Sequence, residues 1–198
     1  MLLGILAVQG AFAEHEAMLR KLHCPYLEIR QLRDLDTPID GLILPGGEST
    51  AMKKLLVDLG LFEPLRRQIV SGLPVFGTCA GLLLLAEEIE NHGVVCFQTL
   101  HVKAVRNAYG RQLGSFETET EFEGIGTVPM VFIRAPFIDE TRGKARPLAV
   151  VDGKIVAARE ENMLVTAFHP ELTEDPSIHA YFLDMCKKSL SSSNLSMK

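Results

Sequence analysis

The chain has 198 residues, enough for one domain with a sizeable hydrophobic core. Its composition, 47% hydrophobic and 23% charged, is typical of a soluble globular protein and excludes wholesale disorder. The formal net charge of −5 offers no basic surface for nucleic acid or an anionic membrane, and no apolar run approaches the ~20 residues of a membrane span. The apolar N-terminus lacks a basic leader, so it is predicted to be a buried strand rather than a signal peptide. We therefore expect a cytoplasmic protein whose partners are small molecules or proteins.

The first half of the chain alternates between short apolar runs and segments with helical spacing. The predicted strands are Leu2–Val8, Tyr26–Arg30, Gly41–Leu44 and Leu73–Gly77. The predicted helices are Glu14–Leu22, Thr50–Leu59 with Ser49 as N-cap, Phe62–Ser71, and a segment from Ala80 onward. This order predicts a parallel sheet with helices on its faces and ligand sites at the carboxyl ends of the strands.

After Gly93 the pattern changes to strand-like segments separated by tight turns such as Asp152-Gly153. These segments cover residues 94–106, 127–135, 147–153, 154–160 and 163–169. We expect them to add antiparallel strands to the same sheet or to a side sheet. A helix is predicted over Pro176–Leu190, followed by a polar, disordered tail over 191–198. The predicted fold class is α/β, with a mostly parallel central sheet flanked by helices, in a single domain over residues 1–190.

A cysteine lies where the fourth strand meets the following helix. The sequence Gly77-Thr78-Cys79-Ala80-Gly81 has the G-x-nucleophile-x-G layout of a nucleophile elbow, in which the glycines let strand and helix approach closely. Such a turn presents the sulfur at a helix N-terminus, which favours the thiolate. The alternative is an inert core thiol, the ordinary state of a free cysteine. The four cysteines form no CxxC pair, so neither a zinc site nor a redox dithiol is indicated.

A histidine and a glutamate follow the last predicted strand. His169 comes directly after an apolar run, and Glu171 lies two positions later. A carboxylate so placed can accept the imidazole N–H, fix the tautomer and stabilise the imidazolium. Alone, the pair is equally well explained as a polar strand end and a solvated charge. Combined with an elbow cysteine, it supplies the Cys, His and Glu that covalent acyl transfer requires.

Gly46-Gly47 ends the third predicted strand. A backbone N–H at Gly47 can point at a developing oxyanion, and the N–H of Ala80 supplies a second donor. Phosphate cradling is the rival interpretation, although no G-K-[ST] follows as in a Walker loop. The other histidines show no metal-ligand spacing, so no metal site is predicted. The carboxylate pairs Glu87-Glu88 and Glu160-Glu161 are interpreted as solvated faces.

Six segments carry a resemblance to a known family. In chain order they are LAVQGAFAEH, PGGEST, FGTCAGLLLLA, RNAYGRQLGSFE, FIRAP and FHPELTED. Together they resemble the glutaminase subunits of pyridoxal phosphate synthase, a branch of the class I, triad-type glutamine amidotransferases with a flavodoxin-like fold. The resemblance runs from the first predicted strand to the last predicted helix. Leu83 stands where many class I domains carry a glutamine, which disfavours the guanine, carbamoyl phosphate and anthranilate branches.

The resemblance implies that Cys79 attacks the side-chain carboxamide of L-glutamine and that His169 protonates the departing ammonia. A glutamyl thioester is then hydrolysed while Glu171 orients His169. No cofactor is implied, because pyridoxal phosphate is a product of the partner. The implied glutamine-binding residues, carried over position by position, are Gly46, Gly47, Glu48, Arg106, Ile133 and Arg134.

The resemblance also implies a protein partner. Free ammonia is protonated in bulk water, so it would travel through a tunnel to a synthase (lyase) subunit within a large hetero-oligomer. That subunit would join the nitrogen to a pentose phosphate and a triose phosphate. Gln9, Gly10 and His15 would lie near the partner and couple docking to formation of the oxyanion hole, because a Gly-Gly peptide flips at little cost.

Two other functions remain open on sequence grounds. A cysteine peptidase or γ-glutamyl hydrolase would use the same elbow but would need an open cleft, and it leaves the RNAYGRQ and FIRAP matches unexplained. A non-catalytic assembly protein would carry Cys79, His169 and Glu171 as a vestige, with the cysteine available for redox sensing.

Overall fold

The computed structural model describes residues 1–90, 96–106 and 114–195. The helices are α1 (Phe12–Lys21), α2 (Ser49–Asp58), α3 (Phe62–Val70), α4 (Ala80–Leu85) and α5 (Ser177–Leu195), with short 3₁₀ turns η1 (Leu32–Asp36) and η2 (Pro170–Leu172). The strands of the main sheet are β1 (Leu3–Leu6), β2 (Tyr26–Ile29), β3 (Gly41–Leu44), β4 (Val75–Thr78), β5 (Ala86–Ile89), β6 (Leu100–Val105), β9 (Phe137–Thr141), β10 (Arg146–Val151), β11 (Lys154–Glu160) and β12 (Met163–Thr166). A separate hairpin consists of β7 (Ser115–Phe122) and β8 (Gly126–Ile133).

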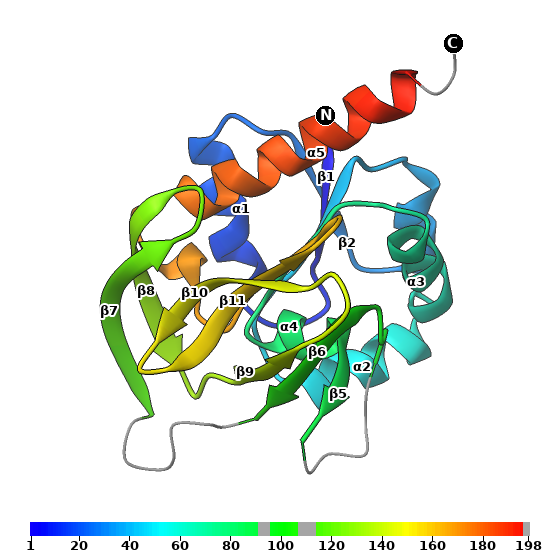
Figure 1. The fold of residues 1–198 in the computed structure, drawn as a ribbon. Coiled ribbons are helices and arrows are strands. Elements are labelled where there is room, and N and C mark those ends of the chain that lie inside the picture. Colours follow the sequence, from blue (N-terminus) through cyan, green and yellow to red (C-terminus); the bar gives the residue numbers. More distant parts are fainter. Residues whose placement is uncertain (91–95, 107–113, 196–198) are drawn as a thin grey trace.

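The main sheet is parallel on one side and mixed on the other. Its order is β2-β1-β3-β4-β12-β11-β9-β6-β5, with β10 paired to β11. The first five strands in this order all run parallel, whereas β11 is antiparallel to β12, β9 and β10. The predicted α/β class is thereby confirmed, with antiparallel strands both in the main sheet and in a side hairpin. That hairpin lies beside β10 at one flank of the molecule (Figure 1).

Alternation along the strands divides the core into two layers. Leu42 and Leu44 of β3 pack with α2, α3 and α4 on one face, whereas Ile43 packs with α1, α5 and the β7–β8 hairpin on the other. Both layers are apolar, which explains why the parallel strands read as continuous hydrophobic runs. Helices therefore cover both faces of the parallel half, and its carboxyl-terminal edge is left for loops (Figure 1).

Three strands were not expected from the sequence. In β7, Phe and Thr alternate with three glutamates, so one face packs and the other is exposed. The strand was not predicted because the glutamates make the segment polar overall. β5 begins where the helix predicted from Ala80 onward ends at Leu85, and β9 is too short and polar to stand out. None of the described helices is long and apolar enough to cross a membrane.

The C-terminal helix runs to Leu195, which corrects the predicted end at Leu190 and the predicted disorder from residue 191. The hydroxyl groups of Ser191 and Ser192 donate to the carbonyls of Lys187 and Lys188, one turn back. The serine hydroxyls therefore find partners within the helix, and the helix continues through these residues. Residues 196–198 of the predicted tail lie outside the described residues.

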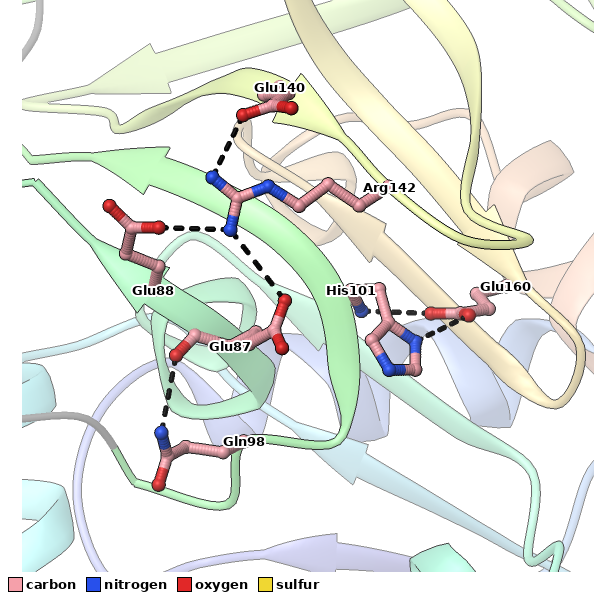
Figure 2. Close-up of polar contacts among 7 residues, drawn as sticks. All are labelled: Glu87, Glu88, Gln98, His101, Glu140, Arg142 and Glu160. Atoms are coloured by element: carbon pink, nitrogen blue, oxygen red, sulfur yellow. Dashed lines mark hydrogen bonds and ion pairs between the residues drawn. The ribbon is translucent and has the colours of Figure 1, made fainter.

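Two polar clusters link strands in this half of the sheet, one between β5 and β9 and one between β6 and β11 (Figure 2). Arg142 contacts carboxylates from two strands, with 2.9 Å to Glu88 and 2.8 Å to Glu140. His101 of β6 donates its backbone N–H to Glu160 of β11 at 2.8 Å, and its Nδ1 lies 2.7 Å from the same carboxylate. Glu160 is only 5% exposed, which corrects its interpretation as part of a solvated face.

The His101–Glu160 contact predicts a pH-dependent contribution to stability. The hydrogen bond to Glu160 raises the pKa of His101, so the contact stabilises the fold fully below the unfolded pKa of about 6.5 and is lost as pH rises through the folded value. His101 is half-exposed, so we expect the H101Q variant to lose ~0.2–1 kcal/mol at about pH 5.5 and less at about pH 9. Urea unfolding at both pH values checks this. An equal or larger loss at the higher pH would refute it.

Candidate active site

Cys79 occupies a strained turn between β4 and α4. Its backbone angles, φ 48° and ψ −97°, lie in a region that costs a non-glycine residue ~1–3 kcal/mol and persists only when the surroundings enforce it. A Cβ at Gly77 would lie 2.7 Å from the Gly81 carbonyl carbon, and one at Gly81 would lie 2.1 Å from the Leu44 carbonyl oxygen. The two glycines are therefore required for the turn, and the predicted elbow geometry is present.

The neighbouring strand brings a histidine and a carboxylate to the elbow. β12 pairs in parallel with β4, with Thr166 opposite Thr78, and the Cys79 N–H donates to the Thr166 carbonyl at 2.8 Å. The chain leaving β12 places His169 Nδ1 2.8 Å from Glu171 Oε1. The adjacent ends of β4 and β12 thus bring Cys79 close to His169 and Glu171, although 90 positions separate Cys79 from His169 in the sequence.

The electrostatics favour a charged histidine. Burial alone would lower the pKa of His169, but hydrogen bonding and charge interaction with Cys79 and Glu171 raise it to about 10. Burial would likewise raise the pKa of Glu171, yet interactions with His15 and His169 hold that pKa below its usual range. At neutral pH the site therefore favours an imidazolium between the sulfur and an ionised carboxylate.

The glycine turn after β3 lies directly against this group. A Cβ on Gly46 would lie 2.3 Å from His169 Cε1, so only glycine fits there. The Gly46 carbonyl accepts the Ala11 N–H at 2.9 Å, and the Glu48 N–H donates to Gln9 Oε1 at 3.0 Å. The segment after β1 therefore holds the glycine turn in its present orientation.

These loops enclose a cavity of about 450 Å³, within the range of small-molecule sites. Its walls come from the carboxyl ends of β1, β3, β4 and β12, where the fold predicts ligand binding. The cavity brings together eleven of the residues singled out from the sequence: Gln9, Gly10, Gly46, Gly47, Glu48, Cys79, Ala80, Arg106, Ile133, Arg134 and His169. Glu171 lies behind His169, outside the lining.

Glu48 also has a local role that the sequence did not indicate. It is the N-cap of α2, in place of the predicted Ser49, and its two carboxylate oxygens accept the N–H groups of Thr50 and Ala51 at 3.0 and 2.7 Å. Arg106 Nη2 lies 3.4 Å from the same carboxylate. Glu48 therefore fixes the start of α2 and steadies Arg106 at the cavity wall.

Arg134 also has an unusual backbone, with φ 44° directly after β8, and its N–H donates to the Gly114 carbonyl at 2.7 Å. Left-handed backbone at a non-glycine residue in a cavity wall is typical of functional loops. Residues 107–113 of the RNAYGRQLGSFE segment lie outside the described residues.

His15 is the one predicted interface residue that the structure contradicts. It is fully buried, with Nδ1 2.9 Å from His179 Nε2 and Nε2 3.2 Å from Thr78 Oγ1. A buried ring cannot contact a partner. Gln9 and Gly10, by contrast, are partly or fully exposed at the cavity mouth.

Sequence reasoning missed the cluster of Thr78, His15 and His179 behind Glu171. A signal existed for His15, because it shares the buried face of α1 with Met18 and Leu19 at i+3 and i+4. A polar side chain on the buried face of a helix needs a hydrogen-bond partner. The sequence alone does not show that this partner is His179 of α5.

Comparisons with known proteins agree with this geometry. Residues 5–188 match the model of the SNO glutamine amidotransferase family. A relative from Haemophilus influenzae, named pyridoxal 5'-phosphate synthase subunit PdxT, is 55% identical over 190 residues, covering 94% of this chain and 99% of that protein. One of the same name from Methanocorpusculum labreanum is 58% identical over 185 residues, covering 93% and 97%.

Solved structures give the same result. One described as a glutamine amidotransferase superposes with a TM-score of 0.89 at 40% identity, covering 93% of this chain and 98% of the other. A glutamine amidotransferase from Thermotoga maritima, with a TM-score of 0.58 and 16% identity over 94% and 84% of the two chains, shares the fold. With an elbow cysteine, a charged histidine and a buried glutamate at one cavity, this chain belongs to the SNO glutamine amidotransferase family.

Proposed function

We propose that the chain hydrolyses L-glutamine to glutamate and ammonia as the glutaminase subunit of a pyridoxal 5'-phosphate synthase. The main support for the proposal is that Cys79 and His169 line a cavity large enough for an amino acid, with Glu171 bonded to His169 from behind. Membership of an amidotransferase family and relatives named PdxT at 53–58% identity support the substrate and the pathway.

The chemistry follows from the charge state of the site. The Cys79 sulfur attacks the glutamine carboxamide carbon, and the resulting oxyanion is held by the N–H groups of Gly47 and Ala80. His169, already an imidazolium, gives its proton to the departing nitrogen, so ammonia leaves and a glutamyl thioester remains. Neutral His169 then removes a proton from water, which attacks the thioester and releases glutamate and the Cys79 sulfur. Glu171 keeps the imidazole oriented in both half-reactions.

The cavity wall offers groups for the rest of the glutamine molecule. Arg106 and Arg134 supply cations that suit its α-carboxylate, while Ile133 can cover the aliphatic stem. Glu48 contributes negative potential near the α-ammonium, and it also keeps Arg106 in place. Binding by these groups holds the carboxamide over Cys79, so the translational and rotational entropy of glutamine is lost on binding and not in the chemical step.

The partner is a synthase (lyase) subunit, joined with this chain in a large hetero-oligomer that carries ammonia away from water. The exposed rim of the cavity, including Gln9 and Gly10, is the proposed docking site. We place the complex in the cytoplasm, because all four cysteines are free thiols, as a reducing compartment keeps them.

Gln9 is expected to couple docking to catalysis. Its side chain accepts the Glu48 N–H and abuts Gly47, so movement of this segment reorients the glycine turn that carries one oxyanion donor. We expect Q9A to lose about tenfold or more of the partner-stimulated kcat, up to the ~10²–10³ cost of one oxyanion donor. The partly exposed Gln68 on α3, away from the cavity lining, gives the control Q68A, which should match the unmodified chain. Full stimulation of Q9A would refute the coupling.

Glutamate release from glutamine, measured with and without a pyridoxal 5'-phosphate synthase lyase subunit, tests the proposal. Activity that rises sharply with the partner supports it. Release from γ-glutamyl peptides without a partner would favour the hydrolase alternative. No turnover of either substrate under any condition would point to the non-catalytic assembly protein.

A further inference from the structure

Behind the predicted triad lies a fully buried polar cluster that the proposed chemistry does not use. It consists of His15 from α1, Thr78 from β4 and His179 from α5, all 0% exposed. Phe76 seals it, packing edge-to-face on both histidine rings at centroid distances of 6.0 and 5.5 Å. Burying two imidazoles in an apolar layer is costly unless their nitrogens are satisfied, so the cluster requires an explanation.

The cluster is aimed at Glu171. His15 Nε2 lies 3.6 Å from Glu171 Oε1, and the Thr78 hydroxyl donates to the same oxygen at 3.4 Å. That oxygen also receives the His169 contact at 2.8 Å. One carboxylate oxygen therefore faces His169 on its catalytic side and His15 with Thr78 on its buried side.

The contacts select the protonation of each ring. Burial lowers the pKa of both buried histidines, that of His179 to about 3, so both rings are neutral. A proton on His15 Nε2 faces an anion, whereas a bare lone pair there would be repelled by it. His15 Nδ1 must then accept the proton of His179 Nε2, across 2.9 Å. This leaves His179 Nδ1, which has no partner among the described residues, as a bare acceptor rather than a stranded donor.

We propose that His15 is a positioning residue for the glutaminase reaction: as the neutral Nε2–H tautomer, fixed by His179, it holds the Glu171 carboxylate ionised and directed at His169. This rests on the proposed function of the site. The titratable groups around His15 are Glu14 on α1, His179 on α5, and His169 and Glu171 after β12. His15 Nε2 and the Thr78 hydroxyl face the Glu171 carboxylate from its buried side.

Three substitutions at His15 separate the two ring nitrogens. In H15Q the side-chain amide reaches the Nε2 position and keeps a donor toward Glu171. In H15N the amide reaches only the Nδ1 position, so it faces His179 and loses that donor, and H15A loses both. We expect kcat with the synthase partner to fall ~10–100-fold in H15N and H15A, with KM nearly unchanged, and to recover to within about threefold in H15Q. The acidic limb of kcat should move to higher pH in H15N and H15A, because a carboxylate with fewer donors has a higher pKa.

Two results would overturn the proposal: wild-type kcat and pH profile in H15A, or a kcat in H15Q as low as in H15A. The second result would mean that the ring only fills space. Nitrogen-15 NMR of the unmodified chain provides a test without any variant or substrate. A neutral Nε2–H tautomer at His15 supports the proposal and an Nδ1–H tautomer overturns it. An unmodified chain that released no glutamate even with its synthase partner would contradict the proposed function, and the NMR result would then still decide which tautomer His15 holds beside Glu171.

Discussion

Replacing Cys79 by alanine is expected to lower the partner-stimulated kcat for glutamine hydrolysis by ~10⁴–10⁶-fold, the range for loss of a nucleophile in a triad. The thioester route disappears with the sulfur, and only water held near the oxyanion donors remains. Glutamine binding should be retained, because the groups proposed to bind it are on other loops. Glutamate release and isothermal titration with glutamine measure the two effects.

Cys24 provides the matched control for this variant. It is also a free, buried cysteine, but it lies just before the amino end of β2, at the opposite edge of the sheet from the cavity. C24A should keep wild-type turnover. A C79A variant that retained more than about a hundredth of the activity would show that Cys79 is not the nucleophile, since loss of one oxyanion donor alone has effects of that size.

The E171Q variant is expected to lower kcat by ~10³–10⁴-fold with little change in KM. Glutamine has the shape of glutamate but no charge, and its amide can donate to His169 Nδ1 and so select the wrong tautomer. Removing the charge also removes one cause of the raised pKa of His169, so less imidazolium is available to protonate the departing nitrogen. Steady-state kinetics with the synthase partner measure both parameters.

Glu174 gives the control for the loss of one carboxylate. It is three residues farther on, its side chain is 96% exposed, and it pairs with Lys21 at the surface. E174Q should leave kcat unchanged, because an exposed ion pair contributes little. If E171Q were also near wild type, the carboxylate would not orient His169, and the proposed roles of His15 and Thr78 would fail with it.

The parts of the site closest to the backbone were predictable from the sequence. Gly77 and Gly81 flank Cys79 because no Cβ fits at either position. The G-x-C-x-G pattern therefore reveals the tight turn directly in the sequence. The same holds for Gly46, whose neighbour is the His169 ring. Parallel strand order then places the ends of β3, β4 and β12 together, which follows from the alternation of strands and helices.

Other features depend on contacts between distant segments, which a single sequence does not specify. His15 was expected at a partner surface, but its neighbour His179 lies 164 positions away, and only the packing of α1 against α5 reveals that it is buried. Glu48 was expected to bind substrate, which stays a prediction, but the sequence did not indicate that its carboxylate also caps α2 in place of Ser49, which is already the first helical residue. The strand β7 was missed because its exposed glutamates hide the packed face.

The proposed glutaminase chemistry requires a covalent glutamyl intermediate on Cys79. The most direct test is to mix the chain with its synthase partner and glutamine, quench with acid during turnover, and determine the mass of the peptide that contains Cys79. We expect this peptide to gain the mass of glutamine minus ammonia and the gain to be absent in C79A. A glutamyl group on any other residue, or steady release of glutamate with Cys79 unmodified at every quench time, would contradict it.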